Sequence, residues 1–210
     1  MKVLGISGSP RKNSNTDRLV QEVLSTVGIE SEFVSLAGRK IAPCIACLKC
    51  VEDNICKVKD DMYELRSKIA EADAYVIGGA TYFAMLNGLT HNFFERFYQF
   101  RHREGKTVSG KPGVAVGVGG RSGDPVVENI KTFFQYNEIE CLGSVSAQGA
   151  ASCLVCGYGE TCKAGAIHRF FGPGTKITPE IVPDLSKQPA KLEEARELGR
   201  KLGERLKAMH

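Results

Sequence analysis

The strongest constraint on the fold of this chain is a repeated alternation of short apolar runs with longer segments of helical periodicity. Leu19, Val20 and Val23, for example, recur at the spacing of one helix face. Strands are expected at residues 2–6, 31–36, 74–79, 112–120 and 141–147. Helices are expected at residues 16–27, 60–73, 88–100, 124–137 and 191–206. Five strand–helix repeats predict an α/β fold, a doubly wound five-stranded parallel sheet with helices on both faces.

Two inserts interrupt the alternation within what we expect to be a single domain of residues 1–210. A cysteine-rich insert occupies about residues 38–58, after the second strand. A stretch rich in Cys, Gly and Pro opens a C-terminal extension of about residues 148–210. The predicted sheet therefore carries two added segments, and both contain clustered cysteines.

Composition and charge exclude several functional classes. The 210 residues are 42% hydrophobic and 25% charged, as in an average soluble globular protein. The net charge is only +4, without the basic stripe of a nucleic-acid surface. The N-terminus lacks a signal-peptide pattern, and no run approaches the ~18 apolar residues of a membrane span. We therefore expect a cytoplasmic protein with no nucleic-acid or membrane partner. Cytosolic thiols stay reduced, which favours metal binding or catalysis over disulfides, except in hyperthermophiles.

The segment GISGSPRKNSNTDRL, residues 5–19, joins the first strand to the first helix and suits a phosphate group. The N–H groups at a helix N-terminus favour an anion, and Arg11 adds positive charge. The side-chain donors of this loop are Ser7, Ser9, Ser14, Asn15 and Thr16. Neither G-x-x-x-x-G-K-[ST] nor G-x-G-x-x-G occurs here. Its position after the first strand favours a ligand site. The alternative is an ordinary turn with a helix N-cap at Ser14 or Thr16.

The stretch SGSPRKNSNT resembles the FMN-phosphate loop of the flavodoxin-like NADPH-dependent FMN reductase family. The resemblance spans about residues 1–147 and includes the later loops GATYFAMLNG and VGGRSGD. It implies that the FMN phosphate is held by Ser9, Arg11, Ser14, Asn15 and Thr16, in a loop that also contains Ser7 and Pro10. It implies that the flavin ring is faced by Thr81, Tyr82, Phe83 and Asn87, with Gly119 and Gly120 at its other edge. Core packing of the aromatic pair and a tight turn at the glycines stay open as alternatives.

Four of the eight cysteines, Cys44, Cys47, Cys50 and Cys56, fall within thirteen residues. Their spacing, C-x2-C-x2-C-x5-C, is the compact type of run that binds iron–sulfur clusters. Zinc sites usually pair two C-x2-C knuckles across a longer loop, so the spacing favours a [4Fe–4S] cluster over zinc. The pattern and its place in the chain resemble the iron–sulfur flavoprotein family, which implies that these four residues are the cluster ligands. Zinc, disulfides and free thiols stay open as alternatives.

A second cysteine group, Cys153, Cys156 and Cys162, repeats part of this spacing in the extension. Three thiols and one further group would hold a second cluster or a zinc ion, and His168 is near enough in sequence to complete a Cys3His site. The alternative is a glycine-rich excursion with reduced cysteines. The remaining cysteine, Cys141, lies at the start of the fifth predicted strand, where we expect it to be buried and inert.

These features point to an oxidoreductase that depends on FMN and a [4Fe–4S] cluster. It would pass electrons between a one-electron, ferredoxin-like donor and FMN, and then to a small acceptor. The sequence offers no convincing Ser/His/Asp or paired-carboxylate site, so no catalytic side chain is assigned. The resemblance also implies a homodimer or homotetramer with flavin and cluster approaching across an interface. The alternatives are an NAD(P)H-dependent FMN or quinone reductase with a structural metal or none, and a non-enzymatic redox sensor or electron carrier.

Overall fold

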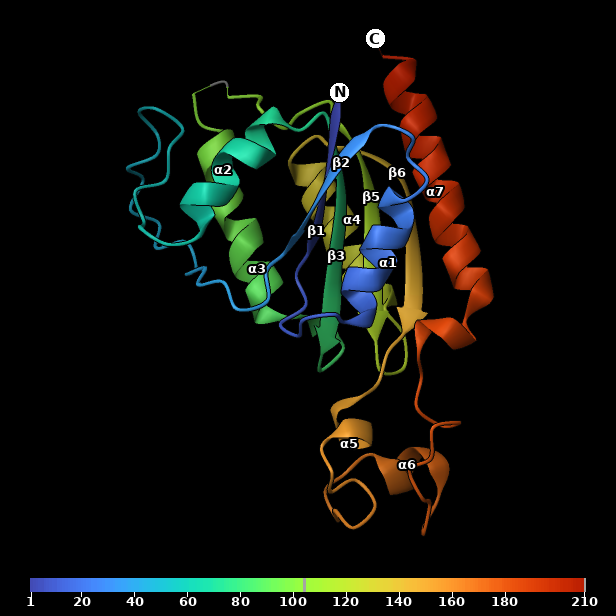
Figure 1. The fold of residues 1–210 in the computed structure, drawn as a ribbon. Helices are drawn as coiled ribbons and strands as arrows, with labels where there is room; N and C mark the ends of the chain where they lie inside the picture. Colours follow the sequence, from blue (N-terminus) through green and yellow to red (C-terminus); the bar gives the residue numbers. More distant parts are fainter. Residues whose placement is uncertain (104, 210) are drawn as a thin grey trace.

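The structure, a computed structural model, describes residues 1–103 and 105–209. Its centre is a parallel sheet in the order β2-β1-β3-β5-β6, with a short antiparallel strand, β4, paired to the end of β3 (Figure 1). The strands are β1 Lys2–Ser7, β2 Glu30–Ser35, β3 Ala74–Tyr82, β4 Met85–Leu86, β5 Pro112–Gly119 and β6 Glu140–Gln148. The order confirms the predicted doubly wound sheet, because the chain moves outward from β1 in both directions.

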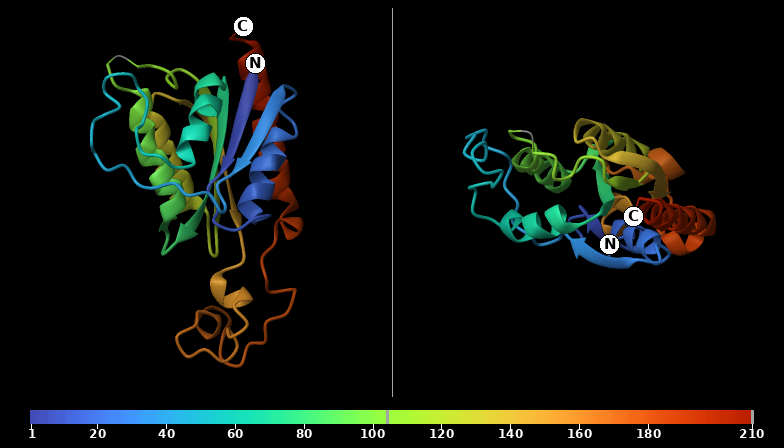
Figure 2. Two further views of the ribbon diagram at one scale, coloured as in Figure 1. Left: turned by 60° about the vertical axis from the view of Figure 1, so that its left-hand side comes forward. Right: turned by 90° about the horizontal axis from the view of Figure 1, so that it is seen from above.

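Helices cover both faces of the sheet (Figure 2). One face packs against α1 Asn15–Leu24 and α7 Pro189–Lys207. The other packs against α2 Met62–Glu71, α3 Gly88–Glu95 and α4 Asp124–Tyr136. None of the helices in the described part of the chain is both long and apolar enough to cross a lipid bilayer.

The two faces bury two separate hydrophobic cores. The strand β5 is buried at every position, as expected for a parallel strand covered on both sides. Leu4 and Ile77 point into the core beneath α3 and α4, whereas Val3 and Val76 point into the core beneath α1 and α7. This alternation fixes the register of the sheet, because a slip by one residue would exchange the two sets.

The C-terminal helix α7 packs against α1 with main chain nearly touching main chain. A Cβ atom at Gly199 would lie 2.1 Å from the carbonyl oxygen of Val23, and one at Gly203 would lie 2.0 Å from that of Val27. Only glycine permits so close an approach. The helix expected at residues 191–206 is confirmed, and its Leu202 is completely buried.

Two elements between β3 and β5 differ from the sequence expectation. The strand β3 runs to Tyr82 and turns back into β4 through Phe83 and Ala84, whose φ angles are 52° and 59°. The helix predicted at 88–100 ends at Glu95 and continues as a 3-10 helix, η1 Arg96–Phe100. The tighter winding places the rings of Phe97 and Phe100 5.2 Å apart in the core.

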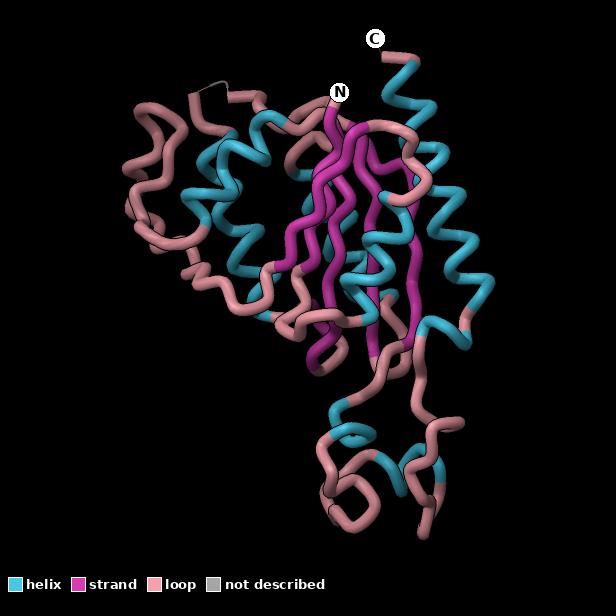
Figure 3. The backbone as a smooth tube through the Cα atoms, viewed as in Figure 1, coloured by secondary structure: helices cyan, strands magenta, loops and turns pink. Residues whose placement is uncertain are grey.

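Both inserts leave the body of the fold. The cysteine insert runs from β2 around the outside of α2 and α3 (Figure 1). The extension leaves β6 beyond the carboxyl ends of the strands and returns to α7 (Figure 3). It contains α5 Ser152–Val155, α6 Ile167–Phe171 and the 3-10 helix η2 Leu185–Lys187. Between β6 and η2 the buried apolar side chains are Leu154 and Ile167 alone, so this excursion has almost no core of its own.

The expectation that Cys141 is buried is wrong. Its side chain is exposed on β6, an edge strand of the sheet. The pairing of β6 with β5 shifts register by one residue between Cys141 and Gly143. This bulge turns Leu142 towards the core in place of Cys141, because an extra residue exchanges the two faces of a strand.

Candidate functional site

A cavity of about 660 Å³ opens at the carboxyl ends of β1, β3 and β5. Ligands of open α/β sheets bind at this edge, and the volume suits a cofactor. The predicted site residues in its wall are Ser9, Pro10, Arg11, Ser14, Asn15, Thr16, Thr81, Tyr82, Phe83, Gly119 and Gly120. The structure therefore gathers residues from three separate loops around one cavity.

The first loop is shaped by its own hydroxyl groups. The main-chain N–H of Arg11 donates to Ser9 Oγ over 3.2 Å. Ser14 is the N-cap of α1: its Oγ accepts from the N–H of Asp17, and the Asp17 carboxylate accepts from the N–H of Ser14. This reciprocal pair fixes where the helix begins and makes Ser14, one of the two N-cap candidates of the alternative interpretation, the N-cap. The first turn of α1 consequently presents main-chain N–H groups and its positive dipole end at the cavity.

The side chain of Arg11 crosses the cavity mouth to the end of β6. Its Nη1 donates to the carbonyl oxygen of Ala150 over 3.5 Å, and its Nη2 donates to Ser152 Oγ over 3.3 Å. The guanidinium is exposed at this mouth and keeps further N–H groups for an anion. Arg11 thus links the first loop to the start of the extension.

Ser7 and Asn87 do not line the cavity. Ser7 is completely buried at the end of β1, and its Oγ accepts from the N–H of Ser9 over 3.4 Å. Asn87 is 3% exposed, and its Nδ2 donates to the carbonyl oxygen of Gly8 over 2.8 Å. Its Oδ1 accepts from the N–H of Ala80 over 3.2 Å. Both side chains lie behind the wall, where they hold the loops that form it.

Two facing loops form the opposite end of the cavity. The β3–β4 hairpin exposes Tyr82 and Phe83 by 47% and 95%, which argues against core packing for this pair. A Cβ atom at Gly119 would lie 2.0 Å from the carbonyl oxygen of Ser122 and 2.6 Å from Thr81 Oγ1. Glycine is therefore required there by the tight turn of its own loop to Ser122, and the Thr81 side chain of the facing loop leaves no more room.

The sequence placed the segment after the fifth strand near this end of the sheet but assigned no residue to a fourth wall of the cavity. It is formed by Gly149, Ala150, Ala151, Ser152, Val182, Pro183 and Asp184, from the two ends of the excursion. The first of these follow directly after β6. The rule that ligands bind at the carboxyl ends of strands, applied to the fifth strand as well, would have found them.

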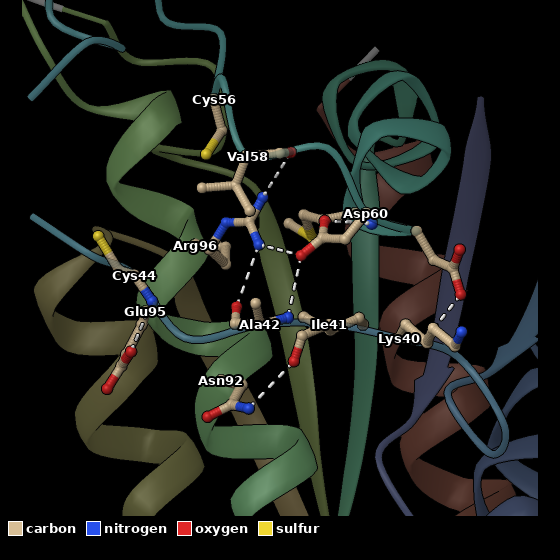
Figure 4. A network of polar contacts seen from close by, with 12 residues as sticks. Lys40, Ile41, Ala42, Cys44, Cys56, Val58, Asp60, Asn92, Glu95 and Arg96 are labelled. Carbon is tan, nitrogen blue, oxygen red and sulfur yellow. Dashed lines mark hydrogen bonds and ion pairs between the residues drawn. The ribbon is translucent and has the colours of Figure 1, made fainter. Parts of the chain in front are cut away.

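The cysteine insert is anchored at both of its ends to α3 and η1 (Figure 4). The N–H of Cys44 donates to the Glu95 carboxylate over 2.9 Å, and the N–H of Cys56 donates to Gln99 Oε1 over 3.1 Å. Arg96, between these two acceptors, donates to the carbonyl oxygens of Ala42 and Val58 over 3.0 and 3.4 Å. The insert is therefore a closed loop whose ends are held together by side chains.

Arg96 also forms a buried ion pair with Asp60, in which Nη1 and Oδ2 are 2.5 Å apart. The same carboxylate oxygen accepts from the N–H of Ala42 over 2.9 Å. Burial acts to raise the pKa of Asp60, but the hydrogen bonds from Arg96, Ala42 and Met62 outweigh it and hold the pKa below its usual value. Asp60 is therefore ionised at neutral pH and matches the charge of Arg96.

The four predicted ligands lie within electrostatic range of one another. Burial raises the pKa of the Cys50 thiol, and the charges of Cys56, Cys44 and Cys47 raise it further. Ala46 and Leu48, which alternate with the cysteines, have φ angles of 50° and 56° in the left-handed region.

Within residues 1–103 and 105–209, no group of three or more His, Cys, Asp or Glu side chains lies close enough together to hold a metal ion. The donor chemistry of the insert nevertheless fits a cluster. The buried Nε of Arg96, beside Cys56, finds no acceptor among the described residues, and a cluster thiolate would supply one.

The second cysteine group lies just outside the cavity. The N–H of Ala166 donates to Cys153 Sγ and the N–H of Tyr158 donates to Cys156 Sγ, each over 3.4 Å. Cys162 Sγ lies 3.5 Å from the position of a Cβ at Gly165, so Cys153 and Cys162 flank the same turn. The ring nitrogens of His168 lie 2.8 and 3.4 Å from two main-chain carbonyl oxygens, which occupies the histidine that was expected to complete a site.

Known proteins are similar to this chain in sequence and in fold. Residues 1–151 match the family model of NADPH-dependent FMN reductases. The chain is 38% identical over 149 residues to an iron–sulfur flavoprotein of Methanocaldococcus jannaschii, which covers 68% of this chain and 76% of that protein. It is 33% identical over 123 residues to an iron–sulfur flavoprotein of Methanosarcina thermophila, which covers 57% of this chain and 64% of that protein. A solved flavodoxin from the domain Archaea shares the fold, with a TM-score of 0.54 at 14% identity and 99% of both chains covered.

The fold and the cavity at the strand ends define a flavodoxin-like flavin oxidoreductase. The chain belongs to the NADPH-dependent FMN reductase family, and within it groups with the iron–sulfur flavoproteins. This confirms the resemblance carried by the first loop. The family match ends at residue 151, so the second cysteine group lies beyond it.

Proposed function

We propose that this protein is an electron-transfer oxidoreductase that uses FMN and one [4Fe–4S] cluster. It passes electrons between a one-electron donor of the ferredoxin type and FMN, and then to a small acceptor. The observation that carries the proposal is the coexistence, in one chain, of a cavity at the strand ends lined by the first loop and a closed loop with four thiols. The same proposal places the protein in the cytoplasm, where its thiols stay reduced.

In this proposal the first loop binds the FMN phosphate. The first turn of α1 supplies N–H groups and Arg11 supplies charge, while Ser9 and Ser14 fix the loop. The hydroxyl and amide donors Asn15 and Thr16 line the same end of the cavity. The hairpin with Tyr82 and Phe83 and the Gly119–Gly120 turn then bracket the flavin ring at the other end, where they shield it from water.

The cluster is assigned to Cys44, Cys47, Cys50 and Cys56. When bound, FMN exchanges one or two electrons and the cluster exchanges one, so together they connect one-electron and two-electron chemistry. The chain's own residues position them: the contacts of Glu95, Arg96 and Gln99 hold the loop closed. In the views of Figures 1 and 2 the cysteine insert flanks α2 and α3, away from the cavity end of the sheet. We therefore propose a homodimer or homotetramer in which the insert of one chain approaches the flavin of another.

The family description supports a second candidate function. Members are described as NADPH-dependent FMN reductases, so NAD(P)H in place of a protein donor is the main alternative. In that case the enzyme would oxidise NAD(P)H without needing the cluster, and the insert would hold a structural metal or none.

Anaerobic purification with counts of iron, sulfide, zinc and flavin per chain tests the proposal. About four irons with matching sulfide and one FMN support it. Zinc and flavin without sulfide support the reductase, and a protein without flavin refutes both functions. A Cys50→Ser variant should lose iron, sulfide and the cluster absorbance while it keeps FMN. Cys141→Ser, on the exposed edge strand, is the matched control and should keep iron, sulfide, the cluster absorbance and FMN.

A further inference from the structure

Arg96 is one of the largest side chains that the fold buries completely, and it lies beneath the cysteine insert. Its side chain is 1% exposed, and that of Asp60 is 8% exposed. Taking a charged pair out of water is costly, so every contact of the pair matters. The acceptors of Arg96 are Ala42, Val58 and Asp60, at the two ends of the insert (Figure 4). The guanidinium therefore closes the loop that carries the four thiols.

One donor of this guanidinium is not used by the loop ends. Both Nη atoms have acceptors, but the buried Nε has none among the described residues. A buried donor without a partner costs about 1–3 kcal/mol. The two Nη atoms are sufficient to hold the loop ends together. The unpaired Nε–H therefore points to a further hydrogen-bond acceptor.

Cys56 lies beside the same guanidinium. Figure 4 shows the Cys56 sulfur directed towards the guanidinium of Arg96. The main chain of Cys56 is fixed there by its bond to Gln99, which stands on η1 together with Arg96. A single short element thus holds both the sulfur and the free donor.

We propose that Arg96 is a positioning residue for the cluster, which donates its Nε–H to the Cys56 sulfur and stabilises the reduced cluster. The inference rests on the proposed function, in which Cys56 is a cluster ligand. Reduction adds one electron from the one-electron donor to the cluster, and no bond or proton is exchanged at Arg96. Hydrogen bonds to cluster sulfurs and nearby positive charge raise the reduction potential, because they stabilise the added negative charge.

Asp60 has the opposite effect in this arrangement. Its carboxylate binds the Nη1 edge of the guanidinium and partly cancels the positive charge. Removal of the Arg96 guanidinium should lower the reduction potential of the cluster, and removal of the Asp60 charge should raise this potential. A clamp that acted only by closing the loop would not produce shifts of opposite sign.

The test is a reductive titration of the holoprotein, followed by electron paramagnetic resonance of the cluster. Arg96→Lys keeps the positive charge but loses the Nε–H and the fork geometry. We expect reduction of its cluster to be about tenfold less favourable, or about 59 mV lower for a one-electron couple. In Asp60→Asn the reduction potential of the cluster should be higher than in wild type. Arg66→Lys is the matched control, because Arg66 Nε also binds the insert, at the Asn54 carbonyl oxygen over 3.4 Å.

The outcomes separate this inference from the proposed function. Wild-type protein without iron and sulfide would refute the proposed function itself. Clusters present in all variants at one common potential would overturn the role of Arg96 alone. If Arg96→Lys cannot hold a cluster, Asp60→Asn provides the test. A raised reduction potential in that variant supports the role of Arg96, and an unchanged or lowered potential overturns it. Wild-type protein labelled with nitrogen-15 arginine needs no variant: magnetic coupling of the reduced cluster to an arginine nitrogen supports the contact, and its absence overturns it.

Discussion

The side-chain amide of Asn87 donates to the main-chain carbonyl oxygen of Gly8 over 2.8 Å and joins two loops that are 79 residues apart in the chain. Thr90 Oγ1 reaches the same oxygen over 3.0 Å. A Cβ atom at Gly8 would lie 1.9 Å from that hydroxyl oxygen, so the contact leaves no room for a side chain. The shape of the first loop therefore depends on α3, which does not itself line the cavity.

Asn87→Ala should weaken FMN binding although Asn87 is not in the cavity wall. The change removes the acceptor of the Ala80 N–H, at a cost of about 1–3 kcal/mol, and leaves Thr90 Oγ1 as the remaining donor to the buried Gly8 oxygen. FMN titration of the apoprotein and urea unfolding should both show the loss. Asn129→Ala, which removes an exposed amide on α4, should change neither quantity. Unaltered FMN affinity in Asn87→Ala would contradict this supporting role.

Arg11→Gln should lower the affinity for FMN but not for riboflavin. Arg11 stands at the end of the cavity where we propose that the phosphate binds, and only FMN carries the phosphate group. Loss of one charge-assisted hydrogen bond of about 1.5 kcal/mol corresponds to roughly tenfold in affinity. The two ligands compared by isothermal titration provide an internal control. An equal loss for both would show that Arg11 acts by shaping the loop through Ala150 and Ser152.

Gly119→Ala should disturb the ring end of the cavity. The added methyl group would meet the main-chain oxygen of Ser122 at 2.0 Å, and a main-chain atom cannot move aside as a flexible side chain can. We expect a cost of about 1–3 kcal/mol in unfolding free energy and weaker flavin binding. In Gly88→Ala the new Cβ meets no described atom within 4 Å, so it serves as the matched control. If both variants bind flavin equally well, the two loops are looser than the structure describes.

Much of the fold follows from local sequence, but the most consequential contacts do not. Helical and strand periodicity locates the strands and long helices, and the N-cap Ser14 is visible in the first loop because capping is a local interaction. Arg96 gave no such signal. Its sequence context is that of an ordinary helix residue, and its burial arises only when the ends of the insert, 54 and 38 residues earlier in the chain, fold over it.

The same argument applies to Asn87 and Cys141. The family resemblance implied that Asn87 faces the flavin ring, whereas its amide donates to Gly8 in the first loop. The exposure of Cys141 depends on a bulge in the pairing of β5 with β6, which the pattern of β6 alone does not encode. A long-range hydrogen bond determines the position of the Asn87 side chain, and the register of the sheet determines that of Cys141.

The ion pair between Arg18 and Asp184 should make stability depend on acid pH. Arg18 Nη1 and Asp184 Oδ2 are 2.6 Å apart, and this bond, with the Ser186 N–H, holds the pKa of Asp184 far below its usual value. A folded-state pKa below the unfolded one adds stability above about pH 4, which is lost as pH falls towards the folded pKa. Asp184→Asn should therefore be less stable than wild type from pH 7 to 5, and the difference in unfolding free energy should shrink at pH 3.

Urea unfolding at these pH values checks the prediction, and Arg18→Gln should show the same dependence of stability on pH. A constant difference down to pH 3 would rule out the pair as its source.

We expect the second cysteine group to bind a metal ion that stabilises the excursion. This segment buries only Leu154 and Ile167, too little apolar surface to hold a small loop structure by itself. Main-chain N–H groups already point at Cys153 and Cys156, as they do at thiolate ligands. A Cys153→Ser/Cys156→Ser double variant should lose zinc, or iron beyond the first cluster, and exchange amide hydrogens faster at residues 152–184. Cys141→Ser is again the control, and FMN content should stay constant in both. Equal metal counts and equal exchange in the double variant and wild type would show that these thiols are free.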